Sequence, residues 1–60
     1  MSAEERLKSA EELLDRLERT RERLEQTEDP DEAIEILTEL SAIAKEVEAQ
    51  LQLAKREAEL

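Results

Sequence analysis

Residues 33–58 have the sequence AIEILTELSAIAKEVEAQLQLAKREA, and the spacing of their apolar side chains predicts an α-helix. One aliphatic row recurs at alternating steps of four and three: Ala33, Leu37, Leu40, Ala44, Val47, Leu51, Ala54 and Ala58. Such a heptad keeps one side of a helix against a partner helix. Ile36 and Ile43 form a second row beside it. The apolar face is therefore wider than one helix–helix contact needs, and we expect the second row to stay exposed to water in a monomer.

A thinner amphipathic segment precedes this one. Its aliphatic residues keep the same alternating step: Ala3, Leu7, Ala10, Leu14, Leu17 and Leu24. Arg21 takes the slot between Leu17 and Leu24, and the flanking row becomes polar along the chain: Leu13, Thr20 and Thr27. Opposite charges four residues apart support a helix here. The ion pairs predicted on this spacing are Glu4–Lys8, Glu12–Arg16 and Asp15–Arg19.

The break between the two segments lies around Asp29-Pro30. Proline is tolerated at the first helical position, so Asp29 is the predicted N-cap of the second helix, as Ser2 is of the first. We predict a single domain over residues 1–60, with a helix over about 3–27, a loop over about 27–29 and a second helix over about 30–59. A connection this short turns the second helix back against the first. The predicted fold is an all-α, antiparallel helical hairpin with heptad, coiled-coil-like packing.

Self-association is expected because one hairpin of this size has a single helix–helix contact. A chain of 60 residues buries only about 60% of its unfolded surface. Two hairpins would make a four-helix bundle, and a ring of three hairpins fits the same pattern. The residues expected to form the core and the self-association surface are Leu7, Ala10, Leu14, Leu17, Leu24, Ile36, Leu37, Leu40, Ile43, Ala44, Val47, Leu51 and Ala54.

Four polar residues lie near the apolar face: Thr20, Thr38, Ser41 and Gln50. They either sit at its edge and bond to water, or form a buried hydrogen-bonded layer that fixes register and the number of chains. Gln50 is the strongest candidate for such a layer because it lies two heptads after Ile36. In an antiparallel hairpin, Gln50 is expected near Ser9.

The composition gives no support for catalysis. The chain has no histidine, cysteine, glycine or aromatic residue, and its net charge is −9. Without imidazole or thiolate groups, and with most glutamates on outward positions, we expect no catalytic residue, no metal site and no cofactor. The negative charge disfavours nucleic acid and anionic membranes as partners. With no apolar run of about 20 residues and no signal peptide, we expect a soluble protein of undetermined compartment, cytoplasmic if natural or expressed recombinantly.

Three features occur together along the whole chain: a Ser-x-x-Glu opening, the Asp-Pro-Asp-Glu start of the second helix, and a surface of Glu, Arg, Lys, Leu and Ala. In these features the chain resembles idealised de novo designed helical hairpins. The resemblance implies a structural protein that assembles with itself.

A second resemblance rests on residues 23–25 through Glu32-Ala33 and on residues 40–58 with Ala44-Lys45. These stretches are similar to the small subunit of bacterial exonuclease VII, a non-catalytic helical hairpin that binds a nuclease large subunit. This resemblance implies an alternative function, that of an accessory module whose partner is another protein.

Overall fold

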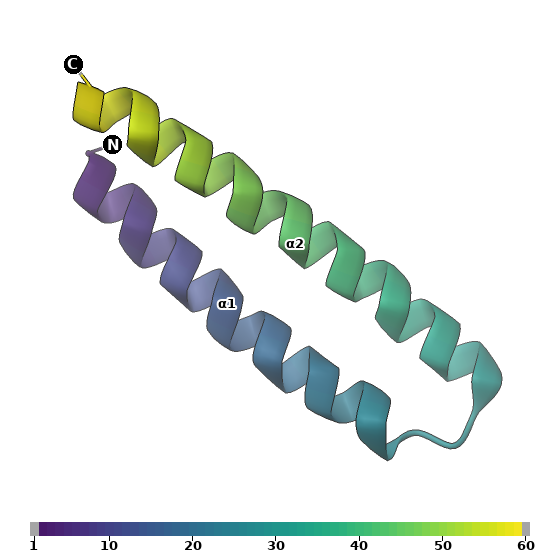
Figure 1. Cartoon of the computed structure of the whole chain (residues 1–60). Coiled ribbons are helices and arrows are strands. Elements are labelled where there is room, and N and C mark those ends of the chain that lie inside the picture. The colour runs from purple at the N-terminus through teal and green to yellow at the C-terminus, as the bar shows by residue number, and fades with distance from the viewer. Residues whose placement is uncertain (1, 60) are drawn as a thin grey trace.

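Two antiparallel α-helices form a hairpin in the computed structural model, which describes residues 2–59 (Figure 1). Helix α1 spans Ala3–Gln26 and helix α2 spans Pro30–Glu59. The start of α1 and the end of α2 lie together, the connecting loop lies at the other end, and the hairpin measures 47 × 14 × 12 Å. The predicted all-helical hairpin is confirmed, with α1 ending one residue earlier than predicted. Residues 1 and 60 of the predicted domain lie outside the described residues.

Helix α1 begins at a side-chain cap and ends without a left-handed residue. The Ser2 Oγ accepts from the backbone N–H of Glu5 at 3.2 Å and donates to Glu5 Oε1 at 3.2 Å. At the other end, Thr27 has extended backbone (φ −82°, ψ 141°), and its N–H donates to the Arg23 carbonyl at 3.1 Å. Glycine is the usual residue where a helix ends in the left-handed region. The extended Thr27 ends α1 in a chain that has no glycine.

Asp29 caps the start of helix α2, and its side chain satisfies a free amide of the first turn. Asp29 Oδ1 accepts from the N–H of Asp31 at 3.0 Å, and the Asp29 carbonyl accepts from the N–H of Ala33 at 2.9 Å. Pro30 therefore occupies the first helical position, where its missing N–H leaves no bond unmade. The N–H of Asp29 donates to Thr27 Oγ1 at 3.3 Å, which closes the loop.

The row of α2 that faces α1 differs from the predicted one. Ile36 and Ile43 are only 1% and 2% exposed in a single chain, so the prediction that they stay exposed to water in a monomer is wrong. The side chains of α2 that are buried or half-buried in this row are Ala33, Ile36, Leu40, Ile43, Val47, Gln50, Ala54 and Glu57. The matching residues of α1 are Ala3, Arg6, Ala10, Leu13, Leu17, Thr20 and Leu24.

Each helix is thus rotated about its own axis relative to the predicted arrangement. The physical reason for this rotation lies in α1. If the row with Leu14 faced α2, it would bring the Arg21 guanidinium into the contact between the helices. The observed rotation buries Thr20 instead, and its hydroxyl donates to the Arg16 carbonyl of its own helix at 2.8 Å. Arg21 stays exposed and pairs with Glu18 and Glu25. Burying an unpaired charge costs far more than burying a hydroxyl that has a hydrogen bond.

Candidate interaction surface

One side of the contact between α1 and α2 is closed by ion pairs. Arg16 Nη2 lies 3.5 Å from Glu39 Oε1, and Arg23 Nη1 lies 3.3 Å from Glu39 Oε2. Each of these three residues immediately precedes a half-buried leucine. We call the side that carries Arg16, Arg23 and Glu39 the ion-paired side. Of the pairs predicted within α1, Asp15–Arg19 is present at 3.7 Å, whereas Arg16 reaches across to α2.

The opposite side carries a row of exposed leucines. Leu7 and Leu14 of α1 and Leu37 and Leu51 of α2 each immediately follow a residue that faces the other helix. Because helical positions before and after an inward residue lie on opposite flanks, these leucines lie away from the ion-paired side. They are 45–52% exposed. We call Leu7, Leu14, Leu37 and Leu51 the leucine face.

The leucine face continues onto the outer surface of α2. Ala44 and Ala58 are exposed on the same seven-residue spacing as Leu37 and Leu51. Beside them Ile34 is exposed. A shallow hollow adjoins this edge of α2, and its lining residues are Ile34, Leu37, Thr38, Ser41, Ala42 and Lys45. Large contiguous apolar patches on a small protein mark sites of interaction.

The predicted core and self-association residues divide between the inside of the hairpin and this face. The buried ones are Ala10, Ile36, Ile43, Val47 and Ala54. The half-buried ones are Leu17, Leu24 and Leu40. The exposed ones are Leu7, Leu14, Leu37, Ala44 and Leu51.

The four predicted polar-layer residues do not form one network. Thr20 is buried and bonded within its own helix. Thr38 and Ser41 are exposed beside the hollow of α2, and the Thr38 hydroxyl donates to the Ile34 carbonyl at 3.1 Å. Of these four residues, only Gln50 makes a polar contact with the other helix.

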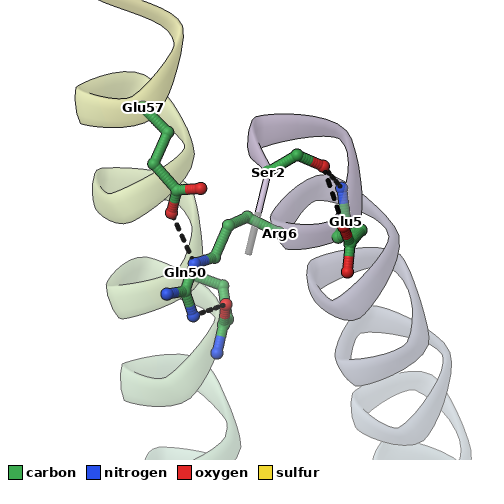
Figure 2. A network of polar contacts seen from close by, with 5 residues as sticks. All are labelled: Ser2, Glu5, Arg6, Gln50 and Glu57. Atoms are coloured by element: carbon green, nitrogen blue, oxygen red, sulfur yellow. Dashed lines mark hydrogen bonds and ion pairs between the residues drawn. The ribbon is translucent and has the colours of Figure 1, made fainter. Parts of the chain in front are cut away.

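Gln50 belongs to a polar cluster at the end of the hairpin where the chain begins and ends (Figure 2). Arg6 Nε donates to Glu57 Oε1 at 2.6 Å, and Arg6 Nη1 donates to Gln50 Oε1 at 3.4 Å. The Arg6 and Glu57 side chains are 24% and 21% exposed. The second oxygen, Glu57 Oε2, is buried without a hydrogen-bond partner. We call Arg6, Gln50 and Glu57 the open-end cluster.

Two members of the open-end cluster were missed by the sequence analysis, which expected Gln50 beside Ser9. The pattern that locates them is the seven-residue spacing. Glu57 follows Gln50 by seven residues, and Arg6 precedes Leu13 by seven. In an antiparallel hairpin both positions fall at the same end and carry opposite charges.

Arg21 follows Thr20 and so lies on the same side as the leucine face. Hydrogen bonding and charge attraction from Arg21 hold the pKa of the Glu18 carboxyl below its ordinary value. The same hydrogen bond and attraction raise the pKa of Arg21. The surface around Arg21 is therefore charged, with one guanidinium paired to two carboxylates.

Among residues 2–59, no group of three or more carboxylates is placed to hold a metal ion. Neither helix of this part of the chain combines the length and apolar character needed to cross a membrane. Comparison with protein families, with characterised proteins and with solved structures finds no match to the chain.

Proposed function

We propose that this chain is a non-catalytic structural protein, a helical hairpin that assembles with copies of itself. In this proposal α1 and α2 pack in a heptad, coiled-coil-like manner, and hairpins join through the leucine face into a helical bundle. The observation that supports it is the contrast between the two sides of the hairpin. Ion pairs cover one side, and half-exposed leucines line the other.

The expected strength of association follows from the exposed apolar surface. Completing the burial of a half-exposed leucine stabilises by roughly 1 kcal/mol, so four leucines from each of two copies give roughly 8 kcal/mol. Association itself costs at least about 4 kcal/mol in lost freedom of motion. The net value is therefore at most about 4 kcal/mol, which corresponds to a dissociation constant of about 1 mM or weaker.

Net charge opposes this association. Each copy carries −9, and like charges on two copies repel each other over about 8 Å at physiological ionic strength. Added salt screens this repulsion without weakening apolar contact. We therefore expect association to strengthen when the salt concentration rises.

Light scattering over a dilution series from about 10 μM to about 10 mM tests the proposal. The expected mass rises from the 6.9 kDa of one chain to a multiple of it. Leu37→Asp should keep the mass at one chain while helicity persists, because Leu37 lies outside the hairpin interior. Gln52→Asp, on an exposed position of the same helix, is the matched control and should assemble normally.

A contrary result has a definite meaning. A wild-type mass of 6.9 kDa at every concentration, with full helicity, would refute self-assembly. It would favour the accessory-module alternative, in which a different protein covers the leucine face. Loss of assembly in both aspartate variants would instead show that added charge, and not the leucine face, controls association.

A further inference from the structure

We infer that two copies dock their leucine faces antiparallel, so that the loop of each hairpin lies beside the chain ends of the other. This inference rests on the proposed self-assembly and adds its partner geometry. It is drawn from the distribution of charge along the hairpin and from the spacing of the leucines.

The loop end of the hairpin is strongly acidic. No lysine or arginine lies between Leu24 and Ile36, and the carboxylates of this stretch are Glu25, Glu28, Asp29, Asp31, Glu32 and Glu35. The end with the chain termini is balanced. Its charged residues are Glu4, Glu5, Arg6, Lys8, Lys55, Arg56, Glu57 and Glu59. These ends are separated by the 47 Å length of the molecule.

This asymmetry distinguishes the two ways of stacking the leucine faces. Parallel docking would place two acidic loop ends side by side, about one helix diameter of 10–12 Å apart. Their repulsion would be only partly screened at that distance. Antiparallel docking places each acidic loop beside Lys55 and Arg56 of the second copy. Complementary potentials of this kind select the orientation of an interface.

The leucine spacing of α2 suits the antiparallel arrangement. Leu37 and Leu51 lie seven residues before and after Ala44, and all three are exposed on one row. A two-fold axis through Ala44 therefore places Leu37 against Leu51 of the second copy, and Leu51 against Leu37. The small Ala44 side chains meet on the axis, where two helices approach most closely. Such a self-complementary contact is what a two-fold interface requires.

Helix α1 meets the same axis at Leu14. Arg6 contacts both Gln50 and Glu57, and Glu39 contacts both Arg16 and Arg23. Because these contacts fix the levels of the two helices, Leu14 lies about level with Ala44. The axis that pairs the leucines of α2 therefore also places Leu14 against Leu14 of the second copy. It places Leu7 beside Arg21 of the second copy, because these residues lie seven positions before and after Leu14.

Pulsed electron paramagnetic resonance, which measures the distance between two spin labels, tests the orientation in the assembled protein. The chain has no cysteine, so a single label can be attached through Glu28→Cys in the exposed loop. The control label is placed through Asp15→Cys, at an exposed position halfway along α1. The distance between two labels at Asp15 is nearly independent of docking direction, so it reports association alone. The distance between two labels at Glu28 depends strongly on direction.

The expected result is a dipolar signal from both labels, with the Glu28 distance approaching the 47 Å length of the hairpin. A Glu28 distance of about 20 Å, alone or beside a longer one, would overturn antiparallel docking while leaving self-assembly intact. A missing dipolar signal from the Asp15 label at about 10 mM protein would overturn both the orientation and the proposed function.

Discussion

Single alanine substitutions at two adjacent residues of α2 distinguish the interior of the hairpin from its leucine face. Ile36 is almost fully buried against α1, whereas about half of Leu37 is exposed. Both substitutions remove three carbon atoms and leave a good helix former in the same turn. Leucine and isoleucine differ in helix propensity by only about 0.2 kcal/mol, so a difference in cost of about 1 kcal/mol reports burial.

The expected costs follow from the exposed fractions. At about 0.8 kcal/mol for each buried carbon, Ile36→Ala costs about 2.4 kcal/mol, with a further contribution from the cavity it leaves. Leu37→Ala in a monomer costs about half as much, or about 1.2 kcal/mol. When the leucine face is covered by a second copy, the cost of Leu37→Ala should approach that of Ile36→Ala. The cost of Ile36→Ala should not depend on concentration.

Urea unfolding monitored by far-ultraviolet circular dichroism measures these costs, since the chain has no aromatic residue for fluorescence. Unfolding curves at about 10 μM and about 10 mM give the monomer and the assembly. Equal costs for the two variants at the lower concentration would refute the burial assigned to Ile36. A cost of Leu37→Ala that stays constant with concentration would refute the role of Leu37 in assembly.

Four further variants test the polar contacts. Arg6→Ala should destabilise the hairpin by about 1–2 kcal/mol because it leaves the half-buried Glu57 carboxylate without its cation. Changing Arg6 and Glu57 together to methionine should restore stability to within about 1 kcal/mol of wild type in urea unfolding, and a double variant no better than Arg6→Ala would contradict this. The lowered pKa of Glu18 predicts a contribution to stability that is present above the unfolded pKa and is lost as the pH falls through the folded pKa. In an NMR titration of the carboxyl groups, Arg21→Gln should raise the pKa of Glu18 toward its ordinary value. An unchanged pKa would exclude Arg21 as the cause. Asp29→Ala should cost about 1 kcal/mol through loss of the cap on α2, seen as a lower urea midpoint at unchanged slope.

The hairpin itself was predictable because its determinants are local. Proline removes a donor and aspartate supplies a cap, so the start of α2 follows from two adjacent residues, Asp29 and Pro30. Thr27 accounts for the slightly earlier end of α1, since its backbone is already extended. No distant contact is needed to place these boundaries.

The rotation of the helices was not predictable from aliphatic spacing alone. Leu40 and Val47 belong to both candidate rows of α2. The two rows differ only at alternate positions, where each member shifts by one residue, from Leu37 to Ile36 for example. The choice between Ile36 and Leu37 is made in α1, where one rotation would bury Arg21 and the other buries Thr20. Which row of α2 faces inward therefore depends on the residues of α1, and the pattern within α2 alone does not predict it.

The open-end cluster shows how the inside of the hairpin and its leucine face depend on each other. Arg6 and Gln50 occupy inward positions that would otherwise hold apolar residues, so the interior contributes little apolar burial at this end. The next residue after each of them is a leucine of the exposed face, Leu7 and Leu51. A second copy covering these leucines would also reduce the access of water to the half-buried Arg6–Glu57 pair, where a lower local dielectric strengthens the attraction. Self-assembly would then stabilise the polar end of the hairpin as well as cover its leucines, so that folding and association become linked equilibria.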